Sequence, residues 1–508
     1  MRTAVKLSMV AALVAAALGL ASCSQMVQPP PTPEELEQLV GTEWYSVLIF
    51  GQPSGYARIE AEVIEGPDGS HMRTSEDVKV LVNLLGQSRE VSKSQITEYD
   101  QQFRPVSIKL VKNELGRPVR AEARLAHGEL VVRTSTEGDS GAPARVDTFE
   151  VPDDLASDLI LGVKLLRGKL DVGDTVEYSV YDPEINVIDR HIVTVDRRES
   201  VDDTEALVVK AASEELGIEV VSWIAGDGTM LRQRAPGLMD LTLERVTEEE
   251  ALASLAPFEL SNVIEVEHHL PLVRSVKEVR LRVIRNLGEA AELIPQTRRQ
   301  TVTPDGQQAS VTISRERPPE DSLPLPITEE SMAEYLQPNK YLQCDDAGLV
   351  ETAQEIVGDE TDAWGAAQKL CSWVHREVEK VQSEPRPVTA LEVLDEMRGD
   401  CTEHAILLAA LGRAVGLPTR MVTGLAYVGG KFGYHAWTEV YVGRWVEMDP
   451  AWGEMTADAG HVLIYSSSLE QAEWARASLA TGRTIGAIEM ELLGYTKADG
   501  ESVGFDEW

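Results

Sequence analysis

The sequence predicts an α+β protein in which N-terminal antiparallel β-rich domains precede a core that joins a cysteine-bearing helix to an antiparallel sheet. Three observations support this fold class. Residues 41–257 are dominated by segments in which apolar and polar residues alternate. Residues 401–415 have the apolar content and the end signals of a helix. Two β-branched and aromatic segments around a glycine turn then follow within residues 419–442.

The first 22 residues have the features of a bacterial signal peptide. Arg2 and Lys6 precede a largely apolar run over residues 9–21, which is too short to span a bilayer comfortably. The run ends in the tetrapeptide LASC, which resembles the lipobox that is cleaved before its cysteine. This resemblance implies a mature N-terminus at Cys23 that carries acyl chains and anchors the protein to a membrane. An ordinary secretory signal peptide is the alternative.

The residues after this cysteine indicate where the protein works. Ser24, rather than Asp, resembles a signal for outer-membrane sorting, so we expect a lipid-anchored protein of a bacterial cell envelope, at the outer membrane where one exists. Residues 23–40 include the proline-rich stretch 29–33 and are expected to form an extended tether. The sequence contains no second apolar run of about 18 residues that could span a membrane.

Two β-rich regions are expected after the tether. Residues 41–257 form the larger one, with one helix at 154–166 and another that begins after Thr247, where Glu250 completes a capping box. Residues 258–326 form a smaller β-rich module that ends in a proline-rich linker. Such modules either position a substrate or act as stalks. The remaining residues, 327–508, form the third expected domain.

Local signals place a cysteine at the start of a helix in the third domain. Asp400 is a typical N-cap and Glu403 completes the capping-box pattern, so Cys401 takes the first helical position. Gly416 and Pro418 end the helix. The unpaired N–H groups and positive dipole end of a helix stabilise a thiolate, which is the reactive form of cysteine.

Strands are expected to carry two further reactive groups. Residues 434–442 form the second strand of the predicted hairpin, in which His435 and Trp437 share one face because side chains alternate. A short strand at 444–448 ends at Asp449. A helix tip packed on this sheet would bring together Cys401 as nucleophile, His435 as base and Asp449 as the acid that orients the base.

Other interpretations of these residues exist. A cysteine beside apolar residues is often a small core residue. His404 is a rival base one turn from Cys401, although a capping role suits its position better, because its side chain points back along the helix. Tyr434 and Trp437 flank the base and are candidates for the wall of a substrate cleft. Aromatic residues in a strand are also common in ordinary packing.

The motifs GDCTEHAILLAALGRAVGLPTRMVTGL, GYHAWTEVYVGRWVEMDP and ALEVLDEMRG, in residues 335–470, resemble the bacterial transglutaminase-like superfamily. The resemblance implies a papain-like core in which Cys401 is the nucleophile, His435 the general base and later acid, and Asp449 the orienting group. It implies a cysteine acyltransferase or amidohydrolase that acts on peptide or side-chain amides through a thioester. The N–H of Cys401 is the expected first oxyanion donor. A catalytically inactive binding or scaffold module is the alternative.

The other cysteines and histidines give weaker signals. Cys371 lies on an apolar helix stripe, where a buried free thiol is the default. A disulfide with Cys344 is the less favoured alternative. His461 is expected to be structural. The pair His268-His269 lacks a third ligand and no CxxC pair is present, so we expect neither a metal nor another cofactor.

The chain is strongly acidic, with a formal net charge of −37 over 508 residues. This charge excludes binding to nucleic acid, which requires neutralisation of phosphates, and it disfavours anionic lipid head groups. It suits a neutral or cationic peptide or protein substrate, but a solvated surface in a salty habitat is the commoner cause of such acidity. The sequence does not indicate an oligomeric state.

Overall fold

The computed structural model describes residues 30–66, 69–84, 87–114, 117–136, 145–157, 159–259, 263–286, 288–381 and 388–505. The predicted signal peptide and Cys23 lie outside these residues, as does the first part of the tether. The described residues divide into two compact units, one within residues 30–259 and the other within residues 263–505. Within the described residues, no helix has the length and apolar character needed to cross a membrane.

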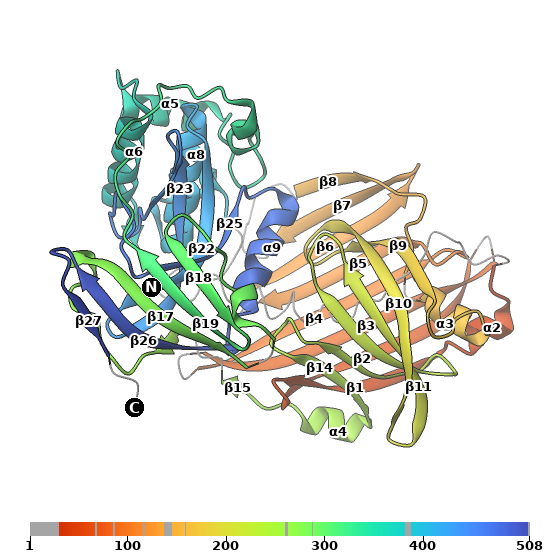
Figure 1. Cartoon of the computed structure of the whole chain (residues 1–508). Helices are drawn as coiled ribbons and strands as arrows, with labels where there is room; N and C mark the ends of the chain where they lie inside the picture. Colours follow the sequence, from red (N-terminus) through yellow and green to blue (C-terminus); the bar gives the residue numbers. More distant parts are fainter. Residues whose placement is uncertain are drawn as a thin grey trace. The chain divides into compact units, whose positions relative to one another are not determined.

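The first unit is built on one antiparallel sheet whose strands follow the order β8-β7-β6-β5-β4-β3-β2-β1-β14-β13-β12-β11-β10-β9, with β15 parallel to β3 at the side (Figure 1). The strands are β1 Gly41–Ile49, β2 Gln52–Gly66, β3 Gly69–Leu84, β4 Gln87–Tyr99, β5 Pro105–Glu114, β6 Arg117–Ala126, β7 Glu129–Thr136, β8 Arg145–Glu150, β9 Thr175–Asp182, β10 Val187–Val201, β11 Thr204–Ser213, β12 Glu219–Ala225, β13 Met230–Ala235, β14 Leu241–Val246 and β15 Phe258–Glu259. Nearly all neighbours in this order are also neighbours in the sequence, so hairpins dominate the sheet.

Alternation explains which face of this sheet is buried. Tyr45, Val47 and Ile49 of β1 are buried on one face, as a period of two requires. The helices of the unit are α2 Pro33–Glu37, α3 Leu159–Leu166 and α4 Glu248–Ala253. The capping box of Thr247 and Glu250 is confirmed at the start of α4.

Helix α3 begins five residues later than the sequence indicates. The expected first turn is instead tied to strand β9, because Asp154 accepts a hydrogen bond of 2.8 Å from the Ser179 hydroxyl. A bridge between Leu155 and the same serine holds the next residue in extended backbone.

The second unit contains two antiparallel sheets. The first has the order β16-β23-β22-β25, with β24 beside β23, and the second has the order β18-β19-β17-β26-β27. Their strands are β16 Val263–Glu265, β17 Val276–Arg285, β18 Gln300–Asp305, β19 Gln308–Ser314, β22 Thr419–Val428, β23 Lys431–Tyr441, β24 Trp445–Met448, β25 His461–Ser467, β26 Ile488–Lys497 and β27 Ser502–Gly504. Strands from the expected module at 258–326 therefore share one sheet with strands near the C-terminus.

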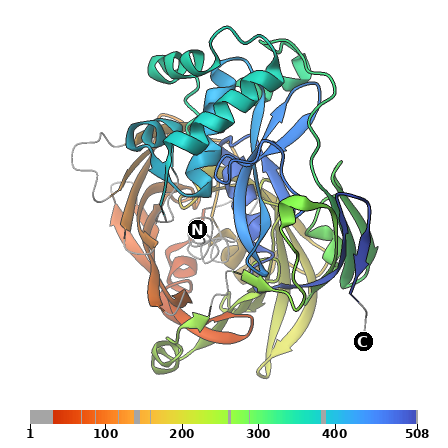
Figure 2. The ribbon, with the colours of Figure 1, turned by 90° about the vertical axis from the view of Figure 1, so that its left-hand side faces the viewer.

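Helices cover the first of these sheets. They are α5 Ala347–Val357, α6 Ala363–Glu377, α7 Ala390–Glu396, α8 Cys401–Ala414 and α9 Gln471–Gly482. The unit also contains three 3-10 turns, which are η1 Val273–Ser275, η2 Ala290–Glu292 and η3 Glu330–Leu336. A short parallel pair is formed by β20 Glu379–Lys380 and β21 Arg398–Gly399. Helices α5, α6 and α7 pack around α8, which packs on β22 and β23 (Figures 1 and 2). Every residue of α8 from Cys401 to Arg413 is buried, so the cysteine-bearing helix is the centre of this core.

Candidate active site

The start of α8 presents Cys401 as the capping signals predict. Asp400 accepts a hydrogen bond from the N–H of Thr402 at 2.9 Å, and Glu403 accepts one from the N–H of Asp400 at 2.9 Å. This confirms the capping box and the first helical position of Cys401. Gly399 is required here, because a Cβ at this position would lie 2.3 Å from that of Glu403.

Strand β23 carries His435 to the same place. The Thr438 hydroxyl, three residues further along β23, donates to the carbonyl of Ala405 at 3.1 Å and fixes the strand to the first turns of α8. The backbone N–H of Ala436 faces the Cys401 thiol. The cysteine and the histidine are thus held on two packed elements, with the thiol beside the residue that follows the histidine.

Asp449 completes the arrangement from the end of β24. His435 Nε2 donates to Oδ2 of Asp449 at 2.8 Å, and both side chains are buried. The other oxygen, Oδ1, accepts from the N–H of Trp452 at 3.0 Å. The backbone of Asp449 exchanges two hydrogen bonds of 2.9 Å with Glu454. Because Nε2 is engaged, Nδ1 is the nitrogen of His435 that can accept a proton from the thiol.

Electrostatics oppose the thiolate that the helix tip was expected to favour. Burial raises the pKa of the Cys401 thiol well above its ordinary value, and the nearby carboxyl of Asp400 adds to the rise. The N–H of Ala436 acts in the opposite direction. The thiol is 7 % exposed, so little water is present to stabilise a charge. The expectation of an environment that lowers the thiol pKa is therefore wrong for this geometry.

The protonation of the capping carboxyls limits this effect. Burial, together with the neighbouring Glu403, raises the pKa of Asp400 to about 8. Two carboxyl groups at such a short distance cannot both ionise readily in a buried site. The pair therefore holds a proton near neutral pH. This shared proton limits the negative charge beside the thiol.

His461 is a member of the cluster that sequence reasoning treated only as structural. It lies at the start of β25, where its Nε2 is 3.3 Å from Oδ2 of Asp449 and its Nδ1 is 2.9 Å from Oδ1 of Asp458. Burial lowers the pKa of His461, but the two carboxylates outweigh it and raise the value to about 10. His461 is therefore a buried cation between two carboxylates.

This cation helps keep Asp449 ionised. Burial raises the pKa of Asp449, but His435 and His461 lower it by more than burial raises it. The resulting pKa is far below the usual range of an aspartate. His435, Asp449 and His461 have the spacing of a metal site, as do Glu454, Asp458 and His461. Both nitrogens of His461 already face carboxylate oxygens at hydrogen-bond distance, so a proton-bearing network explains both groups without a metal.

The two aromatic residues proposed as cleft walls lie inside the protein. Trp437 is 0 % exposed and donates its indole N–H to Glu447 at 3.0 Å. Tyr434 lies on the opposite face of β23 from His435 and accepts a hydrogen bond of 3.0 Å from the Thr484 hydroxyl. Alternation turns Tyr434 away from His435, whereas Trp437 shares the face of His435 and stacks beneath it with ring centroids 6.0 Å apart, so Trp437 is a buried neighbour of the base and not an exposed wall.

Trp452 takes the place that was expected for these aromatics. Its half-buried ring stacks on His435 with centroids 4.4 Å apart and planes inclined by 23°. The signal for it in the sequence was only its position three residues after Asp449 in a turn. His404, the rival base, uses Nδ1 to donate to the carbonyl of Asp400 at 2.6 Å, and burial lowers its pKa. Its ring is therefore held against the backbone of its own helix turn.

The other two described cysteines are separate free thiols. Cys344 and Cys371 are both free and buried. Burial raises the pKa of the Cys371 thiol, so this cysteine is an inert neutral group in the core.

Comparison with known proteins places the site in a family. Residues 350–450 match the transglutaminase-like superfamily, and this range contains Cys401, His435 and Asp449. No curated protein matches the chain. The family match shows that the chain contains a transglutaminase-like domain at residues 350–450.

Three solved structures share low similarity with the chain. One is a proposed cysteine protease from Cytophaga hutchinsonii, at 17 % identity and a TM-score of 0.31, over 46 % of this chain and 85 % of that chain. Another is the periplasmic domain of TgpA from Pseudomonas aeruginosa bound to ethylmercury, at 15 % identity and 0.28, over 38 % and 90 %. The third is a proposed protease from Parabacteroides distasonis, at 12 % identity and 0.18, over 88 % and 70 %.

Proposed function

We propose that the transglutaminase-like domain is a cysteine acyl-transfer enzyme that acts on peptide or side-chain amides through a thioester. The observation that carries this proposal is the buried hydrogen bond of 2.8 Å between His435 and Asp449, beside a cysteine at a helix tip. A buried histidine with one nitrogen fixed by a carboxylate and the other available is the arrangement required of a general base.

The reaction begins with transfer of the Cys401 proton to Nδ1 of His435 as sulfur attacks the amide carbonyl. The carbon–sulfur bond forms and the carbonyl oxygen takes the negative charge. His435 then gives the proton to the departing amine as the carbon–nitrogen bond breaks, which leaves a thioester. Water or a second amine attacks this thioester and releases the thiol. The raised pKa of Cys401 makes proton transfer part of the attack.

The helix tip supplies the electrostatic part of this chemistry. The N–H of Cys401 is in the first turn of α8, where helical N–H groups have no partner within the helix. It is our candidate for a donor to the developing oxyanion. One such donor stabilises a transition state by about 3 kcal/mol.

Acylation by an activated ester tests the proposal directly. The full chain is treated with p-nitrophenyl acetate, and the acetylated residue is identified by peptide mass spectrometry. We expect acetyl on Cys401, no adduct in Cys401→Ala, and acylation slower by about a hundredfold or more in His435→Ala. Cys371→Ser is the matched control and should react as the natural chain does. Absence of acetyl from Cys401, or an unchanged rate in His435→Ala, would contradict the proposal.

The fate of the thioester separates the two possible activities. With the acetylated chain in hand, addition of a primary amine at rising concentration shows whether amide or free acid forms. A product shift to amide at low amine concentration supports acyl transfer, whereas exclusive acid supports hydrolysis. The outcome depends on how well the site excludes water and binds the acceptor.

A binding or scaffold module is the second candidate, and two observations favour it. Cys401 is 7 % exposed, and its surroundings raise the thiol pKa. Both make the thiol unreactive without a substrate-dependent change. Failure of the acylation experiment would leave this module as the function to pursue.

We further propose that the protein is held at a bacterial cell envelope by lipid on Cys23, with a peptide or protein as its partner. The apolar run before Cys23 and the lipobox-like LASC support this. The net charge of −37 argues against nucleic acid as a partner. Membrane fractionation of cells that express Cys23→Ala tests the anchor: the variant should leave the membrane fraction, and its retention there would refute lipidation.

A further inference from the structure

The β-rich unit, whose described residues run from 30 to 259, contains a cavity of about 380 Å³ that is partly open to solvent. Strands from both halves of its sheet order line this space, including β3 and β4 from one half and β12 and β13 from the other. Helix α3 also contributes to the wall. The volume lies in the range of about 300–1,000 Å³ that is usual for small-molecule sites.

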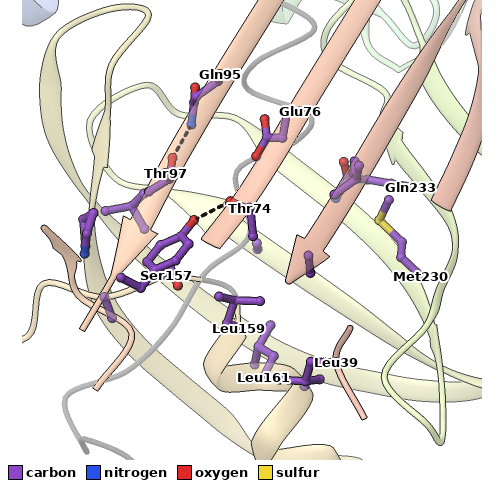
Figure 3. A pocket seen from close by; sticks show the side chains of 18 of the residues that line it. Leu39, Thr74, Glu76, Gln95, Thr97, Ser157, Leu159, Leu161, Met230 and Gln233 are labelled. Carbon is purple, nitrogen blue, oxygen red and sulfur yellow. Dashed lines mark hydrogen bonds between the residues drawn. The ribbon is translucent and has the colours of Figure 1, made fainter. Parts of the chain in front are cut away.

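One end of the cavity is apolar. Leu159 and Leu161 project from α3, and Leu39 joins them from the segment after α2 (Figure 3). Such a cluster fits a hydrocarbon chain, because contact between the chain and the leucines removes the apolar surface of both from water.

Polar side chains on strands line the other part. Figure 3 shows Gln95 on β4 at a distance from the leucines, with its amide nitrogen bonded to Thr97. Gln233 on β13 is 1 % exposed and donates to the Ser222 hydroxyl at 3.1 Å. The carbonyl oxygens of both glutamines are buried without a hydrogen-bond partner. A buried acceptor without a partner is unfavourable. A bound molecule that donates hydrogen bonds to both oxygen atoms would remove this cost.

The charges in the cavity disfavour an anionic ligand most strongly, and they favour a neutral one. Lys93 is the one lysine or arginine among the described residues that line it. Its ammonium group is 2.9 Å from Glu76 and 3.0 Å from Glu184, so two carboxylates already use its charge. An anionic head group would lack a counterion, because the lining also contains carboxylates, namely Glu43, Glu76, Asp182, Asp189 and Asp227. A cationic head group would compete with the partners that these carboxylates already have: Arg245, Lys93 and His191 face Glu43, Glu76 and Asp189, and backbone N–H groups donate to Asp182 and Asp227.

We propose that this cavity binds a neutral single-chain amphiphile, with its hydrocarbon chain against the leucines and a head group whose hydroxyl or amide hydrogens reach Gln95 and Gln233. At about 30 Å³ for each small group, the volume holds roughly a dozen heavy atoms or somewhat more. A medium-length acyl chain on a glycerol-like or amide-like head meets these requirements. This site is separate from the proposed chemistry of Cys401 and does not depend on it.

Three probes with the same chain length test the chemistry of the head group. Isothermal titration calorimetry of the full chain compares monooctanoylglycerol, octanoate and octylamine below their aggregation concentrations. We expect one neutral amphiphile to bind per chain, and both ions to bind about tenfold or more weakly, because octanoate finds no unpaired cation and octylamine must compete with the present partners of the lining carboxylates. Equal or tighter binding of either ion, or no binding of monooctanoylglycerol, would overturn the proposal.

Matched variants test the location. Leu159→Trp should fill the apolar end and weaken monooctanoylglycerol about tenfold or more, whereas Leu165→Trp, on the same helix but outside the lining, should leave its affinity unchanged. Gln95→Leu, at the polar end, should weaken it several-fold and is informative even if Leu159→Trp does not fold. Unchanged affinity in both Leu159→Trp and Gln95→Leu would place the binding elsewhere and refute the assignment.

Discussion

Replacement of His461 by glutamine tests whether a buried cation holds the candidate site together. Glutamine keeps an N–H that can reach Asp449, but it removes the positive charge that His461 places between Asp449 and Asp458 at 3.3 and 2.9 Å. All three side chains are at most 2 % exposed, so water cannot replace the lost charge. Asp449 and Asp458 would then remain buried with less positive charge to balance their negative charges, which is strongly unfavourable.

The magnitude follows from the pKa of His461. Its rise from an ordinary value of 6.5 to about 10 corresponds to roughly 5 kcal/mol of preference for the charged form in the folded state. This contribution is fully present below pH 6.5 and is lost as the pH rises to about 10, because between these two values unfolding releases the proton of His461 and a higher pH favours that release. The part of the lowered pKa of Asp449 that comes from His461 describes the same contact, so it is not added to this figure.

Urea denaturation at pH 7 and at pH 10 measures this effect, with hydrogen exchange in peptides from β23 and β25 as the readout for this unit. At pH 7 we expect His461→Gln to lower the free energy of unfolding by about 3–5 kcal/mol. The natural chain should lose stability between the two pH values by more than the variant does. His269→Gln, at an exposed position, is the control. Equal pH dependence in the natural chain and His461→Gln would show that His461 is not a buried cation.

Three further predictions concern the same unit. Asp449→Asn should keep the fold, as circular dichroism can show, yet slow acylation on the order of a thousandfold, because the amide cannot stabilise the imidazolium; full activity would remove Asp449 from the mechanism. Alkylation of Cys401 by iodoacetamide should rise only at a pH above about 8.5, the ordinary thiol value, since burial raises its pKa; rapid alkylation well below that pH would instead indicate a preformed ion pair with His435. Arg299→Met should lower the free energy of unfolding by about 3 kcal/mol, because it leaves Glu447 buried without its partner at 2.5 Å; unchanged stability in urea denaturation would show that the ion pair contributes nothing net.

Local signals made much of the candidate site predictable from the sequence. The capping box of Asp400 and Glu403, together with the helix that follows it, is encoded within a few residues. The hairpin of β22 and β23 forms around Gly429 and Gly430, as the turn pattern indicates. These features fix where Cys401 and His435 lie along their own elements.

The missing parts of the site depend on contacts between distant segments. His461 reaches Asp449 only because β25 pairs with β22, which in turn pairs with the strand of His435. That approach requires Gly424 on β22, where a Cβ would lie 2.1 Å from the carbonyl oxygen of Val462. A single sequence shows a glycine within a strand, but it does not show which strand packs against it. Trp452 was missed for a related reason, because its stacking on His435 arises from the turn that follows Asp449.

The charge state of the thiol shows why element positions do not suffice to predict chemistry. The helix start stabilises an anion by about 0.3–1 kcal/mol, or up to about 2 kcal/mol when partly buried. Complete burial shifts a pKa by as much as 3–5 units, or roughly 4–7 kcal/mol in the opposite direction. For Cys401 burial is the larger effect, and the net shift is upward. A thiolate in this site therefore needs the positive charge that His435 gains from the same proton, so the reaction depends on the pair held by Asp449 rather than on the helix alone.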